Sequence, residues 1–320
     1  MKSLIRCGSF VLAAVLFFFG TQTLQAAEFV KADVEVKQES KTLFLQIKKG
    51  AKNEPISMQT AIVRYAQDGK TDVSVDLVSV VHIADRRYYK QLDLKFKEYD
   101  CVLYELVAPK GTIPQPGQKS DNPLAMVQKI MMLLLQLDHQ IECVDYTPNN
   151  FVHADMSPKE MQEAMKKRGE TPLTLFLSIV LDMLRKQNME DNAPQEPAEG
   201  FDPFELISDP YGPWKMKVTM ANQMADQVNS GSGLGQTIEA LLIDDRNEKC
   251  MKVLDEQIKA GKRRIAIFYG AAHNPDFETR LQKTYGMKPM KTEWLDAWDL
   301  KRRPVNTVEV LLQIINELNK

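Results

Sequence analysis

The chain of 320 residues has few of the residues and motifs on which several common functions depend. It contains four cysteines but no Cys-x-x-Cys, so a thiolate metal site is not expected. Its net charge is -2 and it has no basic patch with interleaved aromatic residues, which excludes nucleic acid as an expected partner. No glycine-rich segment is followed by Lys-Ser or Lys-Thr, and no Gly-x-Ser-x-Gly occurs. Neither a phosphate-binding loop nor a serine-hydrolase elbow is therefore predicted.

Cysteine is too scarce for a disulfide framework. Apart from Cys7, the chain contains only Cys101, Cys143 and Cys250. An odd number permits one disulfide at most. Cys101 and Cys143 fall in strand-like runs, where cysteine usually behaves as a small buried hydrophobic residue.

Long apolar runs are also lacking, apart from a short one near the start of the chain. Lys2 and Arg6 precede an apolar run over residues 10–19, and the small residues Ala26 and Ala27 follow. This pattern predicts a secretory signal peptide over residues 1–26, with export to the periplasm or the extracellular space. An uncleaved amino-terminal anchor is the competing interpretation. No membrane span is expected in the mature chain.

The rest of the sequence predicts an α/β fold in one domain over residues 27–320. Apolar runs separated by helical sequence predict parallel strands at Val75–Val81, Cys101–Val107, Ile141–Val144 and Ile265–Tyr269. Alternating sequence at Val30–Gln38 and Leu43–Ile47 predicts an N-terminal antiparallel ribbon. We expect a mainly parallel core sheet flanked by helices, with a helical insertion at about 150–260. Residues 188–213, rich in proline and acids, form either a lid or a linker.

Two of the four histidines end similar strand-to-helix joints. His82 follows the run Val75–Val81, and His273 follows the run Ile265–Tyr269 after a glycine. In open α/β sheets, ligands bind beyond the carboxyl ends of the strands. The two histidines therefore indicate a site at this edge. His139 is interpreted as a solvated turn residue, and His153 as a surface or loop-packing residue.

Charged residues in or beside the apolar runs are the other candidates. Glu105 lies in the run Cys101–Val107, where a buried carboxylate requires a cation, a metal or strong donors; a buried Arg-Glu pair is the structural alternative. Asp145 follows the run Ile141–Val144 and is therefore a further candidate site residue. Its structural alternative is a turn or helix-cap residue. Arg246 is either a partner of Glu105 or of an anionic substrate group, or an exposed helix charge. Two imidazoles and a carboxylate are a common ligand set for a catalytic divalent metal.

The order of these motifs resembles the TraB/TIKI superfamily, which includes GumN-like proteins, TIKI-type metalloproteases, ChaN-like haem-binding lipoproteins and erythromycin-esterase-like hydrolases. The resemblance rests on x-x-His82, Tyr-Glu105-Leu, Asp145, Asp-Asp-Arg246-Asn and Gly270-x-x-His273, and it covers most of the chain from about Val75 to Gly286. His82 departs from the pattern, because Ser79 occupies the position where the family usually has glycine.

The resemblance implies an exported, metal-dependent hydrolase that acts on peptide bonds. His82, Glu105 and His273 would hold a divalent metal (Mn, Co or Zn) or share that role with a base, and Arg246 would stabilise the oxyanion or a substrate carboxylate. Asp145 would orient one histidine through its second ring nitrogen. The partner would be a peptide or small-molecule substrate, and a homodimer is left open.

Other interpretations remain open at this point. A metal-free enzyme would use a histidine base positioned by Glu105 for ester hydrolysis. A non-catalytic protein of the same fold would bind haem, a peptide or another small ligand, and haem would suit a histidine beside Met-rich helices. A purely structural envelope protein is the third possibility.

Overall fold

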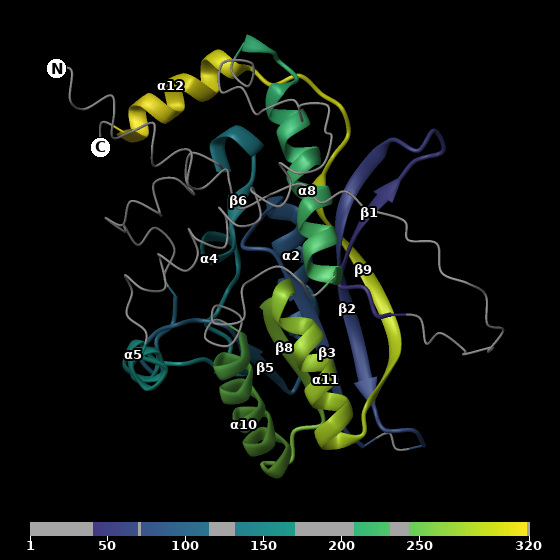
Figure 1. Ribbon diagram of the computed structural model, residues 1–320, viewed down its shortest axis with the longest axis vertical. Helices are drawn as coiled ribbons and strands as arrows, with labels where there is room; N and C mark the ends of the chain where they lie inside the picture. The colour runs from purple at the N-terminus through teal and green to yellow at the C-terminus, as the bar shows by residue number, and fades with distance from the viewer. Residues whose placement is uncertain (1–40, 70–71, 115–131, 170–207, 231–242, 319–320) are drawn as a thin grey trace.

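The computed structural model describes residues 41–69, 72–114, 132–169, 208–230 and 243–318 (Figure 1). The expected signal peptide (1–26), the expected strand Val30–Gln38 and most of the segment 188–213 lie outside the described residues. Within the described part, no helix is long and apolar enough to cross a membrane.

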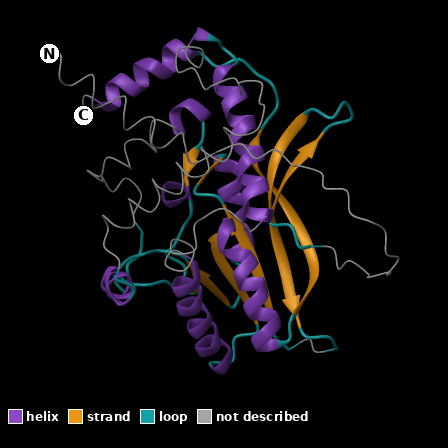
Figure 2. Ribbon diagram, viewed as in Figure 1, coloured by secondary structure: helices purple, strands orange, loops and turns teal. Residues whose placement is uncertain are grey.

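A mixed sheet forms the centre of the protein, and its strands appear in orange in Figure 2. Its strands are β1 (Leu45–Lys49), β2 (Pro55–Ala66), β3 (Ser74–Val80), β5 (Cys101–Tyr104), β7 (Phe151–His153), β8 (Arg264–Gly270) and β9 (Lys288–Asp299). β1, β3 and β9 pair with β2 in antiparallel register. β3, β8, β5 and β7 pair in parallel, in that order. The predicted fold class is confirmed: a mainly parallel core with an antiparallel ribbon on its N-terminal side.

Helices connect and cover these strands. The described helices are α2 (Arg86–Phe96), α4 (Gln140–Cys143), α5 (Pro158–Lys167), α8 (Gly212–Ser230), α10 (Asp245–Lys259), the 3-10 turn η2 (Ala271–His273), α11 (Asn274–Tyr285) and α12 (Thr307–Leu318). A second, two-stranded sheet pairs β4 (Ile83–Ala84) with β6 (Asp138–His139). The expected capping box of α5 is present, since Ser157 and Glu160 each accept from the other's backbone N–H.

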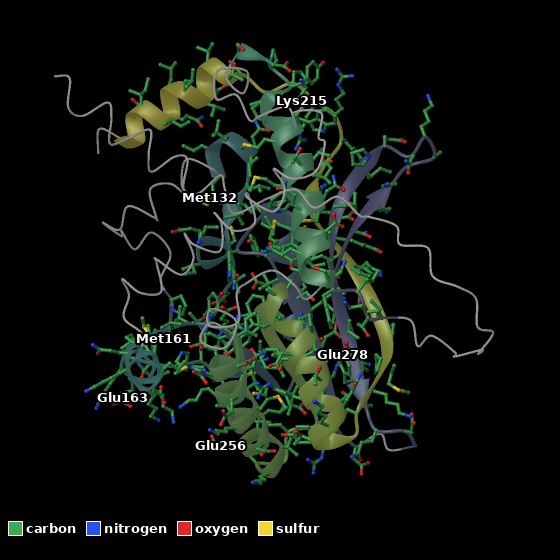
Figure 3. All side chains as sticks on the ribbon, in the orientation of Figure 1. Met132, Met161, Glu163, Lys215, Glu256 and Glu278 are labelled. Carbon is green, nitrogen blue, oxygen red and sulfur yellow. The ribbon has the colours of Figure 1, made fainter. Side chains whose placement is uncertain are left out.

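The two faces of the parallel strands pack against different helices. Along β3, Leu77 belongs to a cluster with residues of α10 and α11, while Val78 belongs to a cluster with residues of α2 and α8. In Figure 1, α10 and α11 lie side by side in front of the parallel strands. Glu278 of α11, labelled in Figure 3, accepts a hydrogen bond from Tyr65 of β2 and joins the helix to the sheet. These parallel strands are buried on both faces, as their near-continuous apolar sequence predicts.

One predicted strand is wrong. Residues 141–144 do not join the sheet; Gln140–Cys143 form the short helix α4. The side chain of His139 accepts a hydrogen bond from the backbone N–H of Ile141 and caps this helix. The strand beside β5 is instead Phe151–His153. A four-residue apolar run is too short for its periodicity to distinguish a strand from a helix.

The three cysteines of the described part are free thiols, so the single disulfide that their number permits is not formed. Cys101 and Cys250 are buried, and burial raises the pKa of the Cys101 thiol to about 12. Cys101 therefore acts as an apolar core residue, as expected. Of the expected helical insertion, the structure describes α5, α8 and α10.

Candidate functional site

The candidate site lies where the parallel strands end. His82 follows β3 by two residues, Glu105 follows β5 directly, and His273 follows β8 through the turn η2. Asp155 follows β7 by two residues. Because parallel strands end at a common edge, residues that are far apart in the sequence meet there.

Gly270 marks the point at which three predicted site residues converge. A Cβ atom placed on Gly270 would lie 3.3 Å from Oε2 of Glu105, 3.5 Å from Nε2 of His82 and 3.7 Å from Cδ2 of His273. The φ angle of Gly270 is -49°, so its backbone does not require glycine. The missing side chain instead leaves room for another atom between the carboxylate and the two imidazoles.

Glu105 points toward α10 because it continues the alternation of side chains along β5. Alternate residues of β5 face opposite sides of the sheet, and Glu105 has the parity of Leu103, which packs in the cluster that contains α10. Its Oε1 accepts from Nη2 of Arg246 at 2.6 Å, and its Oε2 accepts from the backbone N–H of Gly270 at 2.7 Å. Burial opposes its ionisation, but His273, Arg246 and His82 outweigh burial and hold the pKa of Glu105 well below its usual value.

Arg246 joins Glu105 to an acid that the sequence analysis did not select. Its Nε and Nη2 donate to the two carboxylate oxygens of Asp155 at 3.0 and 2.6 Å. The side chain of Asp155 is fully buried and that of Arg246 is 11% exposed. Burial lowers the pKa of Arg246, but the bonds to Asp155 and the charge of Glu105 raise it further, above its ordinary value. The guanidinium therefore stays charged and bridges two carboxylates.

His273 is buried, with 6% exposure, and is held by Asn247 of α10. Its Nδ1 lies 2.6 Å from Oδ1 of Asn247. The Nδ2 of Asn247 donates to the carbonyl of His273 at 3.1 Å and to Asp276 at 2.8 Å. The Nε2 of His273 lies 3.6 Å from Oε1 of Glu105, beyond hydrogen-bond distance.

His82 is held in a similar way but is exposed. Its Nδ1 lies 3.1 Å from Oε1 of Gln140, at the start of α4. The Nε2 of Gln140 donates to the hydroxyl of Tyr146 at 2.8 Å, and its backbone N–H donates to the carbonyl of His82 at 2.8 Å. Gln140 is 4% exposed. Each of the two histidines is thus bonded to a buried side-chain amide through Nδ1.

Ser79, the residue that departs from the family pattern, forms a contact between the two histidine turns. Its hydroxyl accepts from Nδ2 of Asn274, the residue after His273, at 2.7 Å, and both side chains are fully buried. The other amide atom of Asn274, Oδ1, has no hydrogen-bond partner among the described residues.

Asp145 lies away from this site. It is exposed, and its carboxylate accepts from the backbone N–H and the hydroxyl of Thr147 at 2.9 and 2.6 Å. The hydrogen bonds from Thr147 lower the pKa of Asp145. The structure therefore gives Asp145 the turn role, and the second ring nitrogens of the site histidines are bonded to Asn247 and Gln140 instead.

The remaining histidines have local structural roles. His139 caps α4, and its Nδ1 accepts from Ile141. Burial, with a smaller contribution from the charge of His82, lowers the pKa of His139. Nε2 of His153 lies 2.6 Å from the carbonyl oxygen of Leu106, which agrees with its interpretation as a loop-packing residue.

Three residues that contact the site were missed in the sequence: Asp155, Asn247 and Gln140. Asp155 ends the run Phe151–Ala154, and its position after a strand is the signal that was available. Asn247 directly follows Arg246 on α10. Nothing in the sequence around Gln140 distinguishes it from a surface glutamine.

The donor set partly fits a divalent metal. Ligand distances of about 2.0–2.2 Å in tetrahedral geometry place two ligand atoms about 3.3–3.6 Å apart. Glu105 and His273 are separated by 3.6 Å, and the space above Gly270 lies beside both. Within the described residues, no group of three or more His, Cys, Asp or Glu side chains is arranged so that it could hold a metal ion. Nε2 of His82 lies 3.5 Å from the Cβ position of Gly270 and borders the same space.

A separate cavity of about 380 Å³ lies between α5 and α10. Charged side chains line it, including Glu163, which Figure 3 labels on α5. Several of them pair with each other across the cavity: Arg168 with Asp245 and Lys249 with Glu160, both at 2.7 Å. No predicted site residue lines this cavity.

Comparisons of the chain with protein-family models, with curated proteins and with solved structures find no match. Membership of the TraB/TIKI superfamily therefore stays a prediction from the motifs.

Proposed function

We propose that the protein is a metal-dependent hydrolase whose centre is formed by His82, Glu105 and His273. The observation that carries the proposal is the convergence of these side chains on the space above Gly270. A divalent metal held there would supply Lewis acidity for the activation of water and the polarisation of a carbonyl group.

The chain's own residues would prepare this centre. Arg246 and the backbone N–H of Gly270 hold Glu105 ionised and fix both of its oxygens. Since the bonds of Arg246 to Asp155 and Glu105 engage its Nε and Nη2, its first role in the proposal is to position Glu105. Asp145 has no part in this centre.

The substrate class follows from the resemblance to TIKI-type metalloproteases, which points to peptide bonds. Export through a signal peptide would place the enzyme in the periplasm or outside the cell. The carboxyl edge of the sheet is the expected place for the substrate, as in other α/β enzymes.

A metal-free hydrolase is the second candidate, and one feature of the geometry favours it. Both oxygens of Glu105 already accept hydrogen bonds without a metal. In that case Nε2 of His273 would accept a proton from the attacking water and return it to the leaving group.

The first experiment is metal analysis of the purified protein and of three variants. We expect one Mn, Co or Zn per chain in the wild type and loss of metal in His273→Ala and Glu105→Gln. Asp145→Ala, which alters an exposed turn, is the matched control and should retain the metal. A peptide-substrate screen would follow with the loaded protein.

Three results would count against the proposal in different ways. A wild type that is metal-free and cannot be reloaded contradicts the metal centre. Hydrolysis that persists in chelator supports the metal-free enzyme. A coloured protein with a Soret band, and no hydrolysis, supports a haem-binding protein.

A further inference from the structure

The two amides that hold the site histidines also decide where each imidazole carries its proton. A neutral imidazole has one N–H donor and one bare nitrogen, and its hydrogen-bond partners determine which is which. At His273 the partner of Nδ1 is Asn247, at 2.6 Å.

The orientation of the Asn247 amide is determined by groups that can only accept. Its Nδ2 lies 3.1 Å from the carbonyl oxygen of His273 and 2.8 Å from the carboxylate of Asp276. Asp276 in turn forms an ion pair with Arg280. An amide oxygen in place of Nδ2 would face two acceptors, so Oδ1 must face His273.

Since an amide oxygen has no proton to give, Nδ1 of His273 must donate. When the ring is protonated, both nitrogens carry a proton and its charge lowers the pKa of Glu105. When the ring is neutral, Nε2 is bare and lies 3.6 Å from Oε1 of Glu105. A bare nitrogen that faces a carboxylate oxygen leaves room for a cation or a proton donor between them. The orientation of the Asn247 amide therefore leaves Nε2 of His273 and Oε1 of Glu105 able to bind a cation or a proton donor between them.

Gln140 makes the corresponding contact with His82. Its Oε1 faces Nδ1 of His82 at 3.1 Å, while its Nε2 donates to the hydroxyl of Tyr146. Nε2 of His82 then points toward the space above Gly270. A hydroxyl can both donate and accept, so this orientation is less tightly determined than that of Asn247.

We propose that Asn247 and Gln140 are positioning residues that keep the proton of each site histidine on Nδ1 and direct two bare Nε2 atoms toward Glu105. This inference deepens the proposed function and rests on it for its purpose, but the position of the protons can be measured without any metal or substrate. Partners of this kind behind ligating histidines typically change metal affinity by about 10- to 100-fold.

The test is nitrogen NMR on metal-free protein labelled with 15N-histidine, at alkaline pH where ordinary imidazoles are neutral. The chain has four histidines, and His139→Gln and His153→Gln assign two of them. Two-bond correlations should show the Nδ1–H tautomer for His82 and His273. In Asn247→Leu only His273 should move toward the Nε2–H form, and in Gln140→Leu only His82 should do so.

A conservative variant separates this role from simple packing. Gln140→Glu retains an oxygen that faces Nδ1 of His82, and the hydroxyl of Tyr146 can donate to its other oxygen, so it should restore the wild-type tautomer that Gln140→Leu loses. Zinc affinity, measured by titration, should fall about 10- to 100-fold in each leucine variant.

The outcomes distinguish this inference from the proposed function. An Nε2–H tautomer of His273 in the wild type overturns the inference even if Asn247→Leu does not fold. An unchanged tautomer in a folded Asn247→Leu also overturns it. Correct tautomers with no zinc binding by the wild type would support the role of the amides and contradict the metal centre.

Discussion

The two histidine turns at the carboxyl edge of the sheet use similar sequence in different ways. Val80 of β3 pairs with Gly270 of β8, so His82 lies two residues beyond the paired position and His273 three. After Gly270 the chain forms the tight turn η2, which buries His273 between the sheet and α10. After Val80 the chain continues to β4, and His82 remains exposed.

His273 is buried in its turn, whereas His82 is exposed in its own. His273 is held by Asn247, and it lies beside the buried ion pairs of Arg246 with Glu105 and Asp155. Among the described residues, the side chain of His82 is hydrogen-bonded to Gln140, and it is exposed to solvent. We therefore expect replacement of His273 to affect both stability and ligand binding, and replacement of His82 to affect binding alone.

The largest loss of stability is expected for Arg246→Ala, which removes the cation of the buried ion pairs beside His273. The variant leaves the carboxylates of Asp155 and Glu105 without this cation, and removal of one partner from a buried ion pair costs about 3–5 kcal/mol. Urea denaturation measures the loss. Arg168→Ala, which removes a more exposed ion pair with Asp245, should cost no more than about 1 kcal/mol. Equal losses in the two variants would contradict the buried network.

Alanine at each histidine tests the comparison directly. His273→Ala should lower the free energy of unfolding by about 2–4 kcal/mol, because it creates a cavity and leaves the buried Asn247 without its partner. His82→Ala should change it by about 0.5 kcal/mol, since water can replace an exposed ring. Both variants should lose bound metal. Similar stabilities in the two variants would show that the turns do not differ in this way.

Gly270→Ala tests whether a metal binds in the space between the two histidine turns, because the new methyl group would fill that space. The new methyl group would lie 3.3 Å from Glu105 and 3.5 Å from His82, so metal affinity should fall about 100-fold. The fold should be retained because the backbone at Gly270 suits alanine. Ala272→Ser, at an exposed position in the same turn, is the matched control. Unchanged metal affinity in Gly270→Ala would move the centre away from this space.

A smaller effect than that of Arg246→Ala or His273→Ala is expected at Ser79, which links the two turns. Ser79→Ala and Ser79→Gly both leave Nδ2 of the buried Asn274 without its acceptor, at a cost of about 1–2 kcal/mol. Ser79→Gly restores the glycine of the family pattern, and glycine in a strand adds a further fraction of this cost. Thermal denaturation measures both variants. A rise in the melting temperature of Ser79→Gly would show that the hydrogen bond between Ser79 and Asn274 does not stabilise the protein.

Much of the site was predictable because its residues are anomalies in apolar strands. Glu105 needed a partner wherever it was buried, and pairing with Glu105 was one of the three roles considered for Arg246. His82 and His273 were expected at one edge because both follow strands of a parallel sheet. These predictions depend on local sequence and on a general rule of sheet geometry, so they survive without knowledge of the packing.

The choice of Asp145 failed for a local reason. The rule that an acid after the next strand reaches the edge was sound, but residues 141–144 form a helix and the next strand is Phe151–His153. The acid that follows that strand is Asp155, and it is the one that binds Arg246. Four apolar residues do not carry enough periodicity to separate the two structures.

The parallel core, the strand ends and the histidines and glutamate that follow them could be predicted from the amino-acid sequence, because these depend on short apolar runs and strand polarity. Which groups these side chains contact depends on how distant segments pack together. Asn247 reaches His273 from a helix, and Gln140 reaches His82 across 58 positions of sequence. Hydrogen bonds between distant segments depend on register and packing, which no local pattern of residues encodes.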